Sequence, residues 1–317
     1  MASNRRVDVH HHFYPPQYLE AMRQTAGNDR GGGVNFPGVA TWTPAKTLDE
    51  MDKQGVQTAI LSLSPPGVRM LDKEGNRKLA RVCNEFAAQL SHDNPGRFGL
   101  FAPMPMPDVE GTLKEIDYAL DTLKADGIQL MTSYGDRWIG DPDYNEVFDE
   151  LNRRKALVYV HPLASPCSRD LMEWVPDALI EYPHDTSRAV LSLLFSGTLA
   201  RCPDIRFIFS HAGGTIPFLS GRILHSGSNR PFLSRVPKGI DYELRKLHYD
   251  VALASFRPAL AALFAYIPAS QVLLGSDYPF SSVGLSITGL EEYGLPKETR
   301  DALYSGNIER LIPRLKG

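Results

Sequence analysis

The stretch Val7-Asp8-Val9-His10-His11-His12-Phe13 is a short apolar run that changes abruptly into three consecutive histidines. In a β-strand alternate side chains lie on the same face, so His10 and His12 point one way and His11 points the other. Two imidazoles on one face make half of a metal site, but a His-x-His pair alone is common by chance. His11, on the opposite face, is expected to be structural.

Seven further short runs end in polar or turn residues in the same way. They are rich in β-branched and aromatic residues and are mostly apolar on both faces, which is typical of buried parallel strands. Two of these runs end at His161 and His211, and the last one ends at Asp277. The runs cover residues 56–63, 97–102, 127–131, 157–160, 205–209, 247–251 and 271–274, of which 247–251 is the weakest.

Amphipathic patterns with a helical period lie between these runs, at residues 78–91, 109–125, 143–155, 186–200 and 258–266. Asp143 and Asp185-Thr186 are placed to cap the helices that follow them. Strands alternating with helices predict an α/β fold of the (β/α)8 TIM-barrel type, as a single domain over residues 1–317. The alternative is an open doubly wound sheet, but no G-x-G-x-x-G follows the first strand.

One segment, at about residues 16–45, interrupts the alternation. Its central part, residues 24–43, is rich in glycine and polar residues. An insertion after the first strand would lie at the catalytic face of a barrel and form a lid or small subdomain. The alternative is a disordered surface loop. The length of 317 residues, which by itself suggests two domains, is therefore better explained by one barrel with an insertion.

The composition excludes several classes of protein. Lys plus Arg number 34 and Asp plus Glu number 37, so no basic excess is available for binding nucleic acid. No apolar run reaches about 18 residues, so we expect no transmembrane helix and no membrane partner. The N-terminal residues lack the apolar core of a signal peptide. Cys83, Cys167 and Cys202 are far apart and odd in number, which predicts free thiols in a reducing cytoplasm.

The candidate metal ligands fall at the C-terminal ends of the predicted strands, where the active sites of barrels lie. Imidazole and carboxylate groups together suit zinc or another divalent first-row ion. Each residue also has a structural interpretation, with His161 and His211 as hydrogen-bonded histidines and Asp277 as a helix cap. His184 lies in a polar stretch after the fifth strand and is a candidate for the wall of the pocket.

Four motifs and a closing segment span the whole chain. They are Asp8-x-His10-x-His12, Tyr159-Val160-His161-Pro162, Ser210-His211-Ala212-Gly213-Gly214, Leu274-Gly275-Ser276-Asp277-Tyr278-Pro279 and residues 305–311. Together they resemble the amidohydrolase superfamily, and most closely its decarboxylase branch, typified by aminocarboxymuconate semialdehyde decarboxylase. The resemblance implies one divalent ion, zinc or alternatively manganese, no organic cofactor, and a ligand set of His10, His12, His161 and Asp277. It places His211 beside the ion, where it would hold a water or a substrate oxygen.

Two details refine what the resemblance implies. Binuclear amidohydrolases carry a carboxylated lysine at the end of strand four, but here that strand leads into Thr132, so a mononuclear site is expected. Arg222 follows His211 at the spacing of the family. In relatives this arginine binds the substrate carboxylate in the neighbouring subunit, which suits a planar, bidentate guanidinium and implies a homodimer. The alternative is an arginine on the surface of a helix.

The chain also departs from the aminocarboxymuconate pattern. Those enzymes carry an arginine shortly before the Met-Asp of the first helix, where this chain has Thr47, with Lys46 beside it. The departure favours a substrate with a single carboxylate. Residues 10–16, 62–68 and 182–189 are similar to members that decarboxylate 6-methylsalicylate.

The resemblance implies a metal-dependent, non-oxidative decarboxylase, a carbon–carbon lyase, of a small hydroxy-aromatic acid. A ring carbon would be protonated and carbon dioxide released, with Asp277 or His211 as the proton donor. Phe13 and Trp42 would form apolar walls for the ring, unless they are core residues. The alternative is a hydrolase, a lactonase or amidohydrolase, because such a site can also activate water. A metal-binding barrel without activity is a third alternative.

Overall fold

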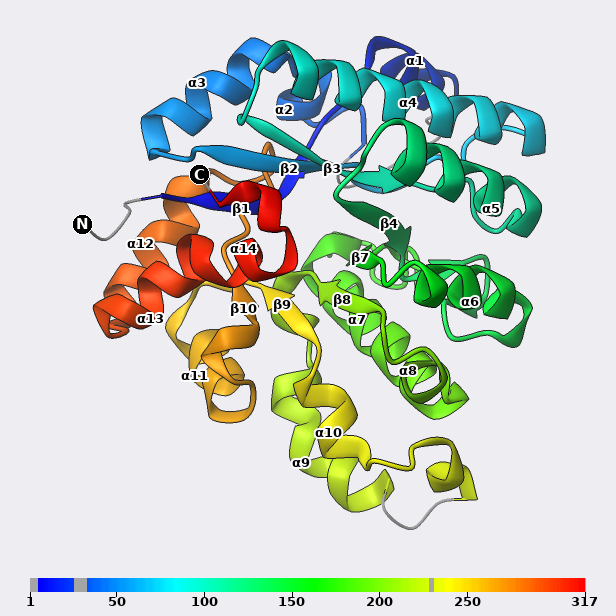
Figure 1. The fold of residues 1–317 in the computed structure, drawn as a ribbon, viewed down its shortest axis with the longest axis vertical. Helices are drawn as coiled ribbons and strands as arrows, with labels where there is room; N and C mark the ends of the chain where they lie inside the picture. The colour runs from blue at the N-terminus through cyan, green and yellow to red at the C-terminus, as the bar shows by residue number, and fades with distance from the viewer. Residues whose placement is uncertain (1–4, 26–32, 228–230, 317) are drawn as a thin grey trace.

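The computed structural model describes residues 5–25, 33–227 and 231–316. Eight strands form one sheet in which every pair is parallel, and Figure 1 shows them at the centre with the helices outside. In order around the sheet, the strands are β1 (Val7–His12), β2 (Thr58–Ser62), β3 (Phe98–Pro103), β4 (Gly127–Met131), β7 (Leu157–His161), β8 (Arg206–Phe209), β9 (His248–Asp250) and β10 (Val272–Leu273). The strands β5 (Ser133–Tyr134) and β6 (Arg137–Trp138) form a separate hairpin.

The first and last strands meet and nearly close the sheet into a barrel. The Val9 amide donates to the Leu274 carbonyl over 3.0 Å, and the His12 amide donates to the Tyr278 carbonyl over 2.8 Å. The predicted TIM barrel is therefore confirmed, and each of the eight runs forms a strand within three residues of its expected bounds. The weakest run forms the short strand β9, because its outer positions turn into loops.

Fourteen α-helices are found in the described residues, and most of them follow a strand. Their bounds are α1 (Pro16–Thr25), α2 (Pro37–Ala40), α3 (Pro44–Gln54), α4 (Lys73–Asp93), α5 (Val109–Asp117), α6 (Asn145–Arg153), α7 (Asp177–Ser196), α8 (Thr198–Arg201), α9 (Ile216–Gly227), α10 (Ile240–Arg245), α11 (Arg257–Tyr266), α12 (Val283–Tyr293), α13 (Lys297–Asp301) and α14 (Asn307–Leu311). None of these helices combines the length and the apolar character needed to span a membrane.

The two predicted helix caps are wrong. Helix α7 begins at Asp177, upstream of Asp185, and it continues through Pro183, which the sequence pattern would have treated as a break. Asp185 instead accepts a hydrogen bond from the Trp138 indole over 2.7 Å and ties α7 to the β5–β6 hairpin. Ahead of α6, the side chain that caps the chain is Asp141, not Asp143.

The interior of the barrel is closed at one end. A cluster of buried apolar side chains fills the barrel axis and continues into α14, and it includes Val7, Phe101, Tyr159, Ile308 and Leu311. Each such side chain stabilises the fold by roughly 1.5–3 kcal/mol through burial. Because this end is packed, the opposite end, where the strands terminate, is the end left for polar side chains.

The predicted insertion begins as a helix. Residues 16–25 form α1 and residues 37–40 form the single turn α2, whereas residues 26–32 lie outside the described residues. The Phe36 ring, just before α2, lies 4.9 Å from the Phe280 ring, and the Phe280 ring lies 5.9 Å from the His12 ring. This part of the segment therefore lies next to the C-terminal end of β1.

Candidate metal centre

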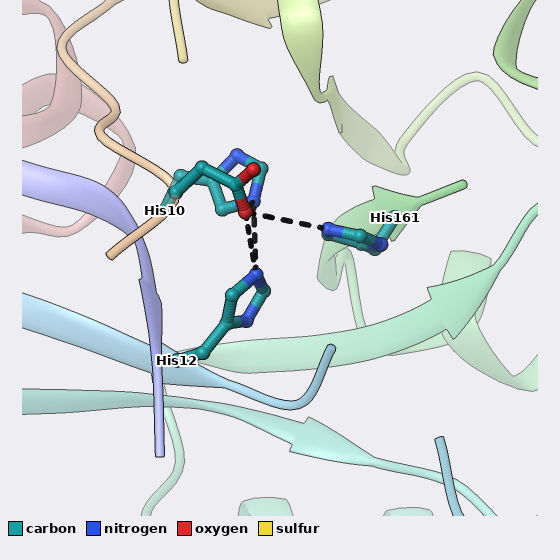
Figure 2. A group of neighbouring side chains, drawn as sticks. His10, His12 and His161 are labelled. Carbon is teal, nitrogen blue, oxygen red and sulfur yellow. Dashed lines mark hydrogen bonds and ion pairs between the residues drawn. The ribbon is translucent and has the colours of Figure 1, made fainter. Parts of the chain in front are cut away.

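The four predicted ligands meet at the C-terminal end of the barrel. His10 and His12 come from β1, His161 is the last residue of β7, and Asp277 follows β10. Figure 2 shows the three imidazoles turned toward one another. All four side chains are buried, and one ligand atom from each lies within 4.8 Å of the others. Alternation along β1 therefore places His10 and His12 on the same face, as the sequence pattern predicts.

The spacing of these atoms fits a single metal ion. The Asp277 Oδ1 atom lies 3.1 Å from His10 Nε2, 2.9 Å from His12 Nε2 and 4.0 Å from His161 Nε2. The His10 and His12 Nε2 atoms are 3.2 Å apart. Tetrahedral ligands at metal–ligand distances of about 2.0–2.1 Å would be about 3.3 Å apart, within this range.

The hydrogen bonds on the far sides of the rings also favour a metal. His12 Nδ1 donates to the Ser62 carbonyl over 3.2 Å, and His161 Nδ1 donates to the Pro162 carbonyl over 2.7 Å. Because these Nδ1 atoms carry the protons, the Nε2 lone pairs point into the cluster. His161 Nε2 is buried and has no hydrogen-bond partner in the part of the chain that the structure describes. A divalent ion would satisfy this atom.

The electrostatics of the cluster are dominated by burial and by two carboxylates. Burial lowers the pKa of His161 to about 3 and also lowers the pKa of His12. Burial also lowers the pKa of His10, but the charges of Asp250 and Asp277 outweigh it and raise that pKa to about 10. Burial raises the pKa of Asp277, but the His10 charge and the imidazole hydrogen bonds hold it well below its usual range. Asp277 is therefore an anion at neutral pH.

A second buried carboxylate, Asp8, joins β1 to the segment that carries Asp277. Its oxygens accept hydrogen bonds from the Ser276 hydroxyl over 2.6 Å, the Ser276 amide over 3.1 Å and His11 Nδ1 over 2.8 Å. The His11 ring also stacks on the Tyr278 ring at 4.6 Å. His11 thus faces away from the cluster and holds neighbouring backbone in place.

The backbone at two site residues is strained. Asp277 has a φ of 70° and His211 has a φ of 54°, both in the left-handed region that non-glycine residues avoid. Such conformations cost roughly 1–3 kcal/mol and concentrate at functional sites. They bring His211 Nε2 to 3.5 Å from Asp277 Oδ2, with the His211 ring 4.9 Å from the His10 ring.

The four candidate substrate residues lie in two different settings. Phe13 and Trp42 are buried, and Trp42 Nε1 has no hydrogen-bond partner within residues 5–25, 33–227 and 231–316. His184 is exposed on α7, and its Nδ1 donates to the Ile180 carbonyl over 2.6 Å. Arg222 is exposed on α9. The structure therefore does not bring His184 and Arg222 into the cluster within this chain.

Sequence reasoning missed one residue of the site. Asp250, the last residue of β9, is fully buried, and its Oδ2 atom lies 3.0 Å from His10 Nδ1. It also lies 3.4 Å from the Tyr159 hydroxyl. The position of Asp250 in the sequence could have revealed it, because Asp250 ends a strand at the same face of the barrel as the ligands. The weak apolar pattern of that strand made this position hard to recognise.

Comparison with known proteins agrees with this geometry. Residues 7–314 match the family model described as amidohydrolase. The chain is 38% identical to the 6-methylsalicylic acid decarboxylase of Penicillium expansum, over 98% of this chain and 97% of that protein. It is 36% identical to decarboxylase yanB of Aspergillus niger, over 98% and 88% of the two chains.

A solved structure is also similar, that of 5-carboxyvanillate decarboxylase from Novosphingobium aromaticivorans in complex with manganese and 4-hydroxy-3-methoxy-5-nitrobenzoic acid. It has a TM-score of 0.85 and 20% identity, and the match covers 97% of this chain and 96% of that one. The chain therefore belongs to the amidohydrolase family. The family and the decarboxylase relatives that the motifs predicted are confirmed.

Proposed function

We propose that this protein is a metal-dependent, non-oxidative decarboxylase of a small hydroxy-aromatic carboxylic acid similar to 6-methylsalicylate. The observation that carries the proposal is the buried group of His10, His12, His161 and Asp277 at the strand ends. It is supported by the 38% identity to a 6-methylsalicylic acid decarboxylase over nearly the whole chain. The ligands suit zinc. Manganese is the alternative, because the solved relative contains that ion.

The reaction needs a proton at the ring carbon that loses the carboxylate. A divalent ion at the cluster would act as a Lewis acid that orients the carboxylate and the neighbouring phenol oxygen. Protonation of the ring carbon makes the ring an electron sink, and departure of carbon dioxide restores aromaticity. The protein must therefore deliver one proton per turnover to a fixed point beside the cluster.

His211 is the better placed of the two candidate proton donors. Its Nε2 atom is 3.5 Å from Asp277 Oδ2, so a proton can be shared between them. The imidazole contacts that hold the pKa of Asp277 far below its usual range keep this carboxylate ionised. His211 therefore delivers the proton as an imidazolium and becomes a neutral imidazole, and Asp277 orients the ring and stabilises the imidazolium before the transfer.

The aromatic residues near the end of β1 would enclose the ring of the substrate. Trp42 lies edge-on to Tyr14 at 6.2 Å, and the Tyr14 hydroxyl hydrogen-bonds the Ser64 hydroxyl over 2.8 Å. The Phe13 ring stacks on Phe86 at 6.4 Å, and the Phe86 ring also lies 6.3 Å from the Trp42 ring. The described part of the predicted insertion, residues 16–25 and 33–45, acts as the lid in this proposal, since Phe36 packs on Phe280 beside the cluster. A contact between His184 and the substrate would require its side chain to leave the Ile180 carbonyl.

Arg222 completes the site in a homodimer in this proposal. It lies one turn from Phe218 on α9, and the Phe218 side chain is 82% exposed. An exposed aromatic ring beside an arginine is the combination enriched at the centres of interfaces. No hydrogen bond or ion pair links Arg222 to the described residues of its own chain. A second copy of the chain would cover Phe218 and place Arg222 near the substrate carboxylate of its neighbour.

The experiment that tests the proposal is incubation of the metal-loaded protein with 6-methylsalicylate in deuterated water. Hydroxybenzoates and 5-carboxyuracil form the comparison panel. We expect release of carbon dioxide and one deuterium at the carbon that carried the carboxylate. Opening of lactones or amides without carbon dioxide would instead support the hydrolase alternative and reject the proposal. Recovery of the protein in the cytoplasmic fraction would agree with its free cysteines.

A further inference from the structure

Asp250 divides its two carboxylate oxygens between two parts of the site. Its Oδ2 atom accepts a hydrogen bond from His10 Nδ1 over 3.0 Å. Its Oδ1 atom accepts from the His211 amide over 3.0 Å and from the Ala252 amide over 3.0 Å. The side chain is fully buried. A single carboxylate thus contacts both a candidate metal ligand and the backbone of the candidate proton donor.

The contact to His10 differs from those of the other two imidazoles. His12 and His161 donate from Nδ1 to backbone carbonyls, which are neutral acceptors. Of the three Nδ1 atoms, only that of His10 donates to an ionised side chain. A carboxylate on the outer nitrogen fixes the tautomer and makes the inner nitrogen a better donor to a metal. His10 is therefore the ligand whose orientation and basicity depend on a replaceable side chain.

The contact to His211 has a different consequence. The left-handed φ of 54° at His211 and of 56° at Ala212 needs compensating contacts to persist. The hydrogen bond from the His211 amide to Asp250 is one such contact, and it anchors the residue from which the imidazole extends toward Asp277.

We propose that Asp250 is a positioning residue that sets the tautomer of His10 and holds His211 in place beside the cluster. The inference deepens the proposed function, on which the role of His211 rests. The part that concerns His10 depends only on metal binding and stands even if the substrate is a different one.

The substitution Asp250→Asn separates this role from simple packing. Because two backbone amides donate to the position of Oδ1, the amide oxygen of the new side chain must lie there. Its NH2 group then faces His10 Nδ1, so a donor meets a donor. His10 must move its proton to Nε2, which removes the lone pair needed for the metal. A packing role alone would tolerate this isosteric change.

The control is Ser62→Ala. The Ser62 hydroxyl lies 3.4 Å from His12 Nδ1, but the Ser62 carbonyl remains in this variant and keeps accepting the His12 proton. The measurement is affinity for Zn²⁺ and Mn²⁺ by competition with a chromophoric chelator. ¹⁵N NMR of the zinc-loaded protein reports which His10 nitrogen carries the proton, because in the metal-free protein the raised pKa of His10, about 10, leaves both nitrogens protonated at neutral pH.

We expect Asp250→Asn to weaken metal binding by about 10–100-fold, with the His10 proton on Nε2, while Ser62→Ala binds metal as the wild type does. Wild-type affinity with an unchanged tautomer in Asp250→Asn would overturn the proposal. Failure of the wild type to release carbon dioxide would reject the proposed function and leave this measurement unaffected.

The contact to His211 is tested at saturating metal by a double-mutant cycle. The losses in kcat from Asp250→Asn and His211→Ala should be smaller in combination than the two single effects together, because one residue acts through the other. KM should change little, since Asp250 lies behind the two histidines. Fully additive losses would contradict this part of the inference.

Discussion

The metal centre and the outer face of α9 differ in how well the side chains there are covered by other residues of the same chain. At the metal centre, His10 and Asp277 are buried among partners from several strands. On α9, Phe218 is 82% exposed and Arg222 is exposed, although both are residue types that gain most from being covered. The difference teaches that a single chain can bring the four metal ligands together, whereas in the proposed function recognition of the substrate carboxylate needs a second copy of the chain.

The largest expected effect comes from removing a ligand. His161→Ala should lower metal affinity by more than about 100-fold, because losing a ligand exceeds the cost of losing its hydrogen-bond partner. Decarboxylation should become undetectable. Metal content after dialysis and the rate of carbon dioxide release test this, with exposed His92→Ala as the control. Full metal occupancy in His161→Ala would remove His161 from the ligand set.

The next largest expected effect comes from Arg222, and it distinguishes the outer face of α9 from the metal centre. Arg222→Ala should lower kcat/KM by about 100-fold, the equivalent of one charge-assisted hydrogen-bonded pair of 2–3 kcal/mol, with metal content unchanged. Mixing this variant with His161→Ala and allowing subunits to exchange should restore about a quarter of the wild-type rate, because half of the random dimers carry one intact site. An inactive mixture that has exchanged subunits would place Arg222 in the site of its own chain or outside the mechanism.

These two predictions rest on parts of the molecule that the sequence reveals unequally. The barrel could be predicted because each buried parallel strand is a short continuous apolar run, and the ligands because they follow those runs directly. Asp250 could not be predicted, and Asp8 was part of the first motif without an assigned role, since both act through hydrogen bonds across the barrel to residues up to 268 positions away. The start of α7 was predicted too late, because Pro183 lies within the helix and proline usually marks the end or the beginning of a helical pattern.

A smaller effect concerns the assembly. Phe218→Asp should weaken the proposed dimer by about 30-fold, since an interfacial aromatic contributes on the order of 2 kcal/mol. Specific activity should then fall on dilution, while metal content stays constant. Sedimentation velocity across a concentration series measures this, with Leu285→Asp on α12, an apolar residue that is 41% exposed, as the control. A monomeric wild type with full activity would show that one chain suffices for catalysis and would reject the proposed role of α9 in a dimer.

The smallest expected effect on activity comes from His248, at the opposite end of β9 from Asp250. His248 instead contributes to the pH dependence of stability. Burial lowers the pKa of His248 to about 4, from an ordinary value of 6.5. Between these values the unfolded chain binds a proton that the folded protein does not, so stability decreases as the pH falls from 6.5 to 4. The loss is up to about 3 kcal/mol.

Denaturant unfolding of the wild type and His248→Gln across this pH range provides the measurement. The variant should lose that part of the pH dependence and keep its metal. Identical pH profiles for the two proteins would show that His248 is not the group responsible. The result would also distinguish His248, which has no carboxylate partner among the described residues, from His10, which has two.

The contact between β1 and the segment after β10 has a consequence for how the protein forms. Three of the four ligands lie at this seam, and His12 and Asp277, which touch there, are 265 residues apart in the chain. A nascent chain therefore cannot assemble the site until synthesis has passed Asp277. Metal uptake during translation would thus report the moment at which the barrel closes, and a chain stalled earlier would remain metal-free even with seven strands in place.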